Sequence, residues 1–237
     1  MFPQQIGVIL TRLEQAGFAA YAVGGCVRDT LLGRVPEDWD VTTAARPEQV
    51  SALFAGHCIP TGLRHGTVTA RQDGLSVEVT TFRADGPYSD HRRPDAVYFS
   101  DSLAEDLARR DLTVNAMAMD VRGDITDLYG GRDDLRRGIL RCVGDPDKRF
   151  DEDALRIMRT LRFASVLGFT VEARTAAALA VRHGCDPREI GEKHIRELQQ
   201  LLLKNDCYIP GRRNTDESDL ARSASVSATS ETAGGEA

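Results

Sequence analysis

Two aspartates separated by one residue are the strongest chemical feature of the sequence. Asp38 and Asp40 flank Trp39, and the alternation from Trp39 to Thr43 predicts a β-strand. Side chains two residues apart on a strand point to the same face, so both carboxylates converge while Trp39 enters the core. Neighbouring carboxylates repel each other unless a divalent cation lies between them. Because the candidate ligands are all hard oxygens, the pair predicts a magnesium site.

A third carboxylate, Glu78, lies on the second strand of a predicted hairpin. Residues 67–72 and 75–82 alternate around Asp73-Gly74, which is a strong turn signal. Glu78 reaches the two aspartates if their strands are neighbours in one sheet. An isolated Asp-x-Asp is more often a solvated strand face and a lone Glu means little, so the prediction depends on their combination.

A glycine turn precedes the aspartates. Gly24 and Gly25 lie between an apolar run at 19–23 and a helical stretch that ends near Leu32. At such a turn, backbone N–H groups can approach phosphate oxygens, and Arg28, one helical turn later, could pair with them. Two glycines at a turn are usually only a turn, and this is neither a Walker loop nor GxGxxG. The signal gains its force from the aspartates that follow.

A charged face lies on a helix predicted at 150–167. Glu152 and Arg156 are four residues apart, and Arg159 and Arg162 continue at helical spacing. Charged helix faces are common, and such a pair contributes only roughly tenths of a kcal/mol. Spacing alone therefore favours a solvated face over a binding site.

The elements that must position these groups divide the chain into three parts and predict an α+β fold. Residues 1–147 mix strands and helices and predict a small mixed sheet with helices packed on it, with a charged loop at 83–95. Residues 148–204 are predicted to form a helical segment, and they are the only part with net positive charge. Residues 205–237 are rich in Ser, Thr and Ala with almost no large apolar residue, so a disordered tail is expected. The helices predicted in the second part span 150–167, 172–183 and 191–203.

Composition excludes several classes of protein. No run approaches the ~18 apolar residues of a membrane-spanning helix, and the first residues, MFPQQIGVILTR, lack the features of a signal peptide. The five scattered cysteines contain no CxxC pair and favour neither a disulfide framework nor a zinc site. We expect a soluble, cytoplasmic protein without a membrane partner.

The assembled pattern resembles the tRNA CCA-adding enzymes and bacterial poly(A) polymerases of the second nucleotidyltransferase class. The resemblance covers about residues 15–170 and rests on VGGCVRDTLLGRVPEDWDVTT, IPTGLRHGTVTA, VEVTTFRADGPYSDHRRPD, LARRDLTVNAMAMD, DLYGGRDDL and KRFDEDALRIMRTLRF. It implies a catalytic nucleotidyltransferase head at 1–147 and a nucleotide-selecting helical neck at 148–204. The loop at 84–95 resembles one that CC-only members lack, which argues against CC-only addition.

The resemblance also implies roles for single residues. Asp38 and Asp40 would hold two Mg²⁺ ions, one on the triphosphate and one on the RNA 3′-hydroxyl, with Glu78 as the third catalytic carboxylate. Asp153 and Arg156 would select the base, because cytosine and adenine present an amine and a ring acceptor where uracil and guanine present a carbonyl. The residues assigned to nucleotide binding are Gly25, Arg28, Arg110, Asp153, Arg156, Arg159 and Arg162.

The implied activity is magnesium-dependent, template-independent addition of CMP and AMP to the tRNA 3′ end, from CTP and ATP, with release of pyrophosphate. A-only addition or poly(A) polymerisation is an alternative, and a truncated nucleotide-binding module that extends no RNA is another. The resemblance ends near Leu203, where family members continue with tRNA-binding helices. A missing C-terminal RNA-binding part and a homo-oligomer both remain open.

Overall fold

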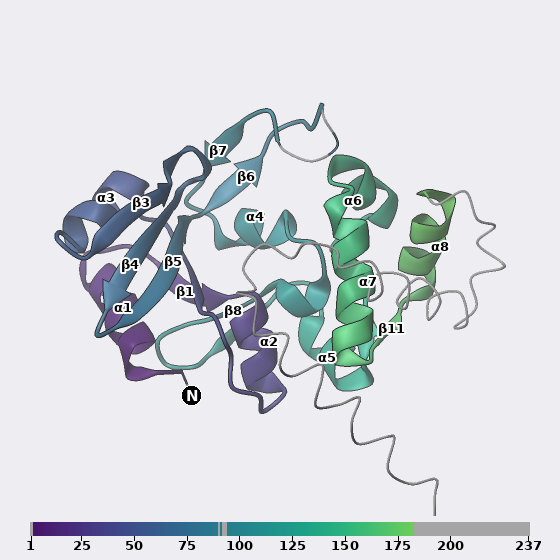
Figure 1. Ribbon diagram of the computed structural model, residues 1–237, viewed down its shortest axis with the longest axis horizontal. Coiled ribbons are helices and arrows are strands. Elements are labelled where there is room, and N and C mark those ends of the chain that lie inside the picture. Colours follow the sequence, from purple (N-terminus) through teal and green to yellow (C-terminus); the bar gives the residue numbers. More distant parts are fainter. Residues whose placement is uncertain (1, 90, 92–93, 183–237) are drawn as a thin grey trace, which may run out of the picture. The chain divides into compact units, whose positions relative to one another are not determined.

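A mixed β-sheet forms the centre of the computed structural model, which describes residues 2–89, 91 and 94–182 (Figure 1). These residues all belong to one compact unit. The sheet has seven strands in the order β3-β4-β5-β2-β1-β8-β9. Only β2 and β5 run parallel; the other neighbouring strands of this sheet are antiparallel. The strands are β1 Ala20–Val23, β2 Asp40–Thr43, β3 Cys58–Gly62, β4 Thr67–Gln72, β5 Leu75–Thr81, β8 Met117–Met119 and β9 Ile125–Asp127.

Helices pack against this sheet and continue beyond it, which confirms the predicted α+β class (Figure 1). Helices α1 and α3 pack against the sheet, contacting β1, β3, β4 and β5 between them. Helix α4 packs near β1 and β8, where its Leu107 contacts Val23 and Ala118. The helices are α1 Gln4–Gln15, α2 Gly25–Leu31, α3 Pro47–Leu53, α4 Leu103–Ala108, α5 Gly131–Arg137, α6 Pro146–Glu152, α7 Leu155–Leu167 and α8 Ala173–Arg182.

The register of the central strands decides which side chains leave the core. Val41 of β2 lies opposite Val79 of β5, and both are at most 1% exposed. Because side chains alternate along a strand, the preceding pair, Asp40 and Glu78, points to the opposite face. The hairpin predicted between β4 and β5 is confirmed, with Asp73 and Gly74 both at positive φ, as its turn requires.

The strand predicted to carry both aspartates is shorter than expected. β2 begins at Asp40, and Asp38 lies in a bend before it, so the two aspartates are not on one strand. The antiparallel partner of β2 ends at Val23, because Gly24 has φ 85° and leads into α2. Upstream of Asp40 no β1 backbone is therefore left to pair with. Trp39 is buried, as predicted.

The helix predicted at 150–167 is two helices, α6 and α7, separated at Asp153 and Ala154. Asp153 has extended dihedral angles, φ −144° and ψ 105°, and its carboxylate accepts a hydrogen bond from the backbone N–H of Leu155 at 2.9 Å. A short Asp side chain that bonds the backbone in this way competes with the helical pattern.

Short strand pairs were also missed in two places. β6 (Arg83–Asp85), at the start of the predicted charged loop, pairs with β7 (Val97–Phe99), which follows the loop. β10 (Ile139–Leu140) and β11 (Thr170–Val171) pair in parallel, on either side of the boundary predicted between residues 147 and 148. The helix predicted at 191–203 and the tail at 205–237 lie outside the described residues. No helix in the described part of the chain is long and apolar enough to span a membrane.

We expect Gly131→Ala to destabilise the fold. A β-carbon at Gly131 would lie 2.9 Å from the carbonyl carbon of Thr113 and closer still to its oxygen, and these backbone atoms cannot move aside. Such overpacking costs about 2 kcal/mol, which urea unfolding would measure. Gly7→Ala is the control, because Gly7 lies within α1 and its new methyl would meet only the Phe2 ring. Equal stability of the two variants would contradict the prediction.

Candidate active site

Acidic side chains gather where β2 begins. Asp40 lies opposite Glu78 in the parallel register, and Asp38 precedes it by two residues. The pKa of Asp40 is raised, first because the surrounding protein desolvates the carboxylate and then because Glu78 and Asp38 add negative charge. Arg110 and Arg159 act in the opposite direction. The residue still has an exposed surface, so its carboxylate is accessible as well as crowded by charge.

The donor set at this position fits a divalent cation. Asp38, Asp40 and Glu78 supply only carboxylate oxygens, which are the ligands that Mg²⁺ prefers. Their mutual repulsion is the condition that a bound cation relieves. Among the described residues, no three His, Cys, Asp or Glu side chains are already arranged to hold a metal ion.

The predicted glycine turn lies beside these carboxylates. Gly24 has φ 85° and ψ −132°, a conformation that side chains rarely allow, and it is the N-cap of α2. Its amide donates to the carbonyl of Met117, which ties the turn to β8. A β-carbon at Gly24 would lie 3.2 Å from Nη1 of Arg110. The guanidinium of Arg110 therefore lies directly against the turn.

Arg28 is held by protein groups. Its Nε and Nη2 each donate to Asp29 at 2.9 Å, and its Nη1 donates to Asn115 at 2.7 Å. Its guanidinium lies 5.0 Å from the centroid of the Phe163 ring, which belongs to α7. Arg28 thus joins α2 to the segment after α4 and to α7, in addition to the phosphate contact expected for it.

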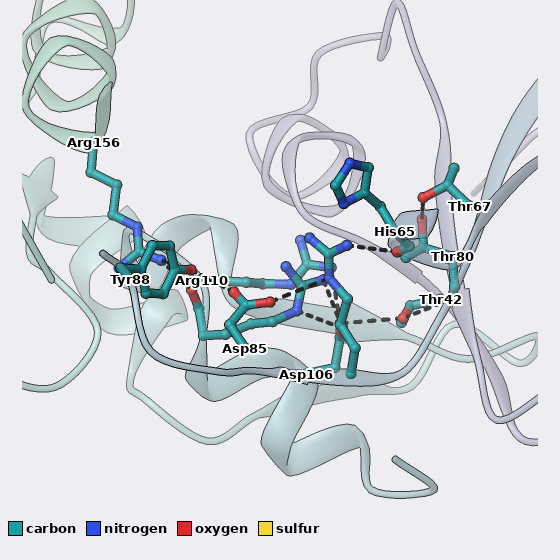
Figure 2. Close-up of polar contacts among 11 residues, drawn as sticks. Thr42, His65, Thr67, Thr80, Asp85, Tyr88, Asp106, Arg110 and Arg156 are labelled. Carbon is teal, nitrogen blue, oxygen red and sulfur yellow. Dashed lines mark hydrogen bonds and ion pairs between the residues drawn. The ribbon is translucent and has the colours of Figure 1, made fainter. Parts of the chain in front are cut away.

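Arg109 and Arg110, at the end of α4, share one buried acid. Asp106 accepts hydrogen bonds from Nε and Nη2 of Arg109 at 3.0 and 2.8 Å. It accepts another from Nη2 of Arg110 at 3.1 Å (Figure 2). The hydroxyl of Thr42, on β2, donates to it at 3.2 Å and shares its one hydrogen with the carbonyl oxygen of Thr80 at 3.3 Å. Burial would raise the pKa of Asp106, but the two arginines outweigh it and the pKa is lowered. Asp106 is therefore an ionised carboxylate within the protein.

Arg156, on α7, is 6% exposed and surrounded by acceptors. Its Nη1 donates to Glu152 at 2.7 Å, and its Nη2 donates to the carbonyl of Arg109 at 3.1 Å. Nη2 also lies 3.4 Å from the hydroxyl of Tyr88, whose ring centroid is 5.8 Å from the guanidinium carbon (Figure 2). The arginine thus joins α7 to the end of α4 and to the segment after β6.

The other arginines of α7 gather on one aromatic ring. The guanidinium carbons of Arg159 and Arg162 lie 5.7 and 4.8 Å from the centroid of Phe163, which Arg28 approaches from α2. Nε of Arg159 also donates to buried Asp111 at 2.7 Å. Three arginines predicted to bind nucleotide are thereby brought together, whereas Asp153 lies at the break between α6 and α7.

Several residues of this arrangement were not found from the sequence. Asp106 precedes Arg109 and Arg110 by three and four residues, a helical spacing that could have indicated the pairing. Tyr88 and Thr42 gave no comparable signal, because their contacts join segments far apart in the chain.

If Arg156 selects the base, as the sequence predicts, Tyr88→Phe should weaken that selection modestly. The hydroxyl of Tyr88 donates to Asp85 at 2.7 Å and lies within reach of Arg156, whereas the ring over the guanidinium would remain. The contact from Arg156 is long, at 3.4 Å, so losing it costs about 1 kcal/mol, and the preference for CTP over UTP should fall less than tenfold. Tyr98→Phe, at an exposed tyrosine of β7, is the control. An unchanged preference in Tyr88→Phe would show that the hydroxyl does not orient Arg156.

Comparison with known proteins identifies the family. A family model described as the poly A polymerase head domain matches residues 20–141. The chain belongs to this family. The match includes the carboxylates of β2 and β5, the glycine turn and Arg110, whereas the arginines of α7 lie beyond it. The poly A polymerase head domain is thus the part of the chain that carries the acidic face of the sheet.

Relatives and solved structures agree with this family. The CCA-adding enzyme of Lactobacillus helveticus is 53% identical over 189 residues, which are 80% of this chain and 47% of that protein. The Bacillus stearothermophilus CCA-adding enzyme in complex with CTP is similar with TM-score 0.71 and 48% identity, over 76% of this chain and 44% of that one. A tRNA nucleotidyltransferase with a primer tRNA and an ATP analogue gives TM-score 0.61 and 29% identity, over 83% and 60%. The chain spans about half the length of the curated relatives it matches.

Proposed function

We propose that the chain is a magnesium-dependent nucleotidyltransferase that adds CMP and AMP to the 3′ end of tRNA, without a template and with release of pyrophosphate. The observation that carries the proposal is the pairing of Asp40 with Glu78 on one face of the sheet, beside a glycine turn covered by Arg110. The similarity to CCA-adding enzymes, one of them solved with CTP, supports these substrates. In this proposal the protein acts in the cytoplasm.

The carboxylates would provide the catalytic centre. Asp38 and Asp40 would hold two Mg²⁺ ions, with Glu78 as the third acid. Bound there, the ions would supply charge stabilisation to the triphosphate and lower the pKa of the RNA 3′-hydroxyl. The part of the protein is to hold the carboxylates at the start of β2 and beside it on β5, where the register already places two of them. No covalent intermediate with the protein is required.

Basic and base-reading residues would orient the nucleotide. The Gly24-Gly25 turn would bind the triphosphate at the start of α2, with the guanidinium groups of Arg110 and Arg28 close to the turn. Asp153 would accept the exocyclic amine of cytosine or adenine, and Arg156 would donate to the neighbouring ring acceptor. Arg159 and Arg162 would complete the nucleotide site from α7. In this proposal residues 1–147 act as the catalytic head and residues 148–204 as the selecting neck.

The test is extension of three tRNA transcripts that end before CCA, after the first C and after CC. Each nucleotide is offered singly, then CTP with ATP, with magnesium, and the products are resolved by length. Stepwise growth to CCA would support the proposal, and growth by A alone would assign A-only or poly(A) addition. Because the chain spans about half of its relatives, a third outcome is informative. CTP binding without extension of any RNA would assign a nucleotide-binding module instead.

A further inference from the structure

Asp106 is a buried carboxylate to which the proposed function gives no role. It is 0% exposed, and both its oxygens are occupied (Figure 2). Oδ1 accepts both bonds from Arg109, whereas Oδ2 accepts one from Arg110 and one from Thr42. If Asp106 served only to stabilise α4, its ion pair with Arg109 through Oδ1 would be sufficient. The second oxygen connects the acid to two other parts of the site.

Each bond to Oδ2 leads to a group of the proposed nucleotide site. Thr42 follows Asp40 by two residues on β2, so its side chain leaves the strand on the same face as that carboxylate. Arg110 lies against Gly24, with Nη1 3.2 Å from the position of a β-carbon there. Nε of Arg110 is buried without a hydrogen-bond partner among the described residues. Asp106 therefore holds this guanidinium, by accepting the hydrogen bond that its Nη2 donates at 3.1 Å.

We propose that Asp106 is a positioning residue, which holds Arg110 against the glycine turn in the orientation that binds the triphosphate of the incoming nucleotide. The inference rests on the proposed function, because it takes Arg110 as a nucleotide contact. A long arginine side chain loses rotamer freedom when it binds a ligand, and a buried acid that fixes it beforehand removes part of that loss. The bond from Thr42 fixes the acid relative to the catalytic strand.

The test measures nucleotide affinity of the whole chain, with CTP and ATP as probes. In Asp106→Asn, the amide keeps one accepting oxygen but its NH₂ group cannot accept from a guanidinium. Loss of this charge-assisted bond should raise the dissociation constant for both nucleotides about tenfold. Asp133→Asn is the matched control, because Asp133 also pairs with an arginine three residues later, Arg136, but on the exposed face of α5. The affinity of the Asp133→Asn variant for CTP and ATP should equal that of the wild type.

A double-mutant cycle with Arg110→Met separates positioning from a merely structural role. If Asp106 acts through Arg110, Asp106→Asn should cost no further affinity once Arg110 is absent, and the two effects should be strongly non-additive. Independent, additive effects would overturn the inference. So would wild-type affinity in Asp106→Asn.

A second variant covers the case in which Asp106→Asn does not fold. Thr42→Val removes one donor to Oδ2 and leaves both arginine pairs, so affinity should fall about threefold with the melting temperature nearly unchanged. An unchanged affinity in this variant would overturn the inference. The readout does not require RNA extension. If the wild type binds CTP but extends no tRNA, the proposed function fails while the cycle still decides the role of Asp106.

Discussion

Asp40→Asn should lower the rate of nucleotide transfer by about a thousandfold without loss of stability. Desolvation, with Glu78 and Asp38 nearby, raises the pKa of Asp40 in the folded chain. A raised pKa means that the fold favours the protonated form, so this group stabilises the fold at acid pH and the contribution is lost as pH rises through the folded value. At neutral pH the negative charge of Asp40 therefore lowers the free energy of unfolding of the metal-free protein. The neutral amide of Asn removes this destabilisation.

Two measurements check the prediction for Asp40. Single-turnover extension of a tRNA that lacks CCA gives the rate, and thermal melting at pH 7 with and without magnesium gives the stability. Magnesium should raise the melting temperature of the wild type, because it binds only the folded chain, and should have little effect on Asp40→Asn. Asp124→Asn, at an exposed turn, is the control for removal of one negative charge. Retention of more than a tenth of the wild-type rate would contradict a metal-binding role for Asp40.

Local signals in the sequence sufficed for much of the fold that carries this site. The hairpin of β4 and β5 follows from Asp73-Gly74, whose positive φ angles few other residue pairs adopt readily. The apolar face of α1 follows from the helical spacing of Ile6, Ile9 and Leu10, and all three residues are fully buried. In each case the determinants lie within a few residues of one another.

The features that the sequence predicted wrongly or did not reveal depend on contacts between segments distant in the chain. The start of β2 depends on where β1 ends, and so on Gly24, which the residues around Asp38 do not reveal. The short pairing of β6 with β7 joins residues more than ten positions apart through a segment that reads as a charged loop. The same holds for the site. Spacing pointed to Arg156 as one half of an i,i+4 pair with Glu152, but gave no sign of its contacts with Tyr88 and the carbonyl of Arg109.

Arg156→Ala should relax nucleotide choice by on the order of a hundredfold, measured as the ratio of kcat/KM for CTP to that for UTP. The proposed pair of Asp153 and Arg156 offers one acceptor and one donor to the base. Cytosine matches this pattern, whereas uracil presents a carbonyl to the carboxylate of Asp153. Without the guanidinium, CTP loses its second bond and with it much of its advantage. An unchanged ratio would contradict base reading by Arg156.

A structural role of Arg156 needs a separate control, because the side chain is buried and paired with Glu152. Glu152→Gln weakens that pair and keeps the guanidinium, and the other oxygen of Glu152 is bonded by Arg149. It should therefore slow the use of CTP and UTP alike, with little change in their ratio. A ratio that falls equally in Glu152→Gln and in Arg156→Ala would show that the ion pair, not the guanidinium, sets selectivity.

Asp153→Asn completes the argument, because it changes the pattern at the other half of the proposed pair. The amide can turn to donate to the carbonyl of uracil, which the carboxylate can only repel. UTP use should therefore rise in absolute terms in this variant, whereas in Arg156→Ala the ratio falls mainly because CTP use declines. Damage to the fold lowers both rates and cannot raise one of them. A gain in UTP incorporation would thus identify Asp153 as a base-reading residue independently of any loss of stability at the break between α6 and α7.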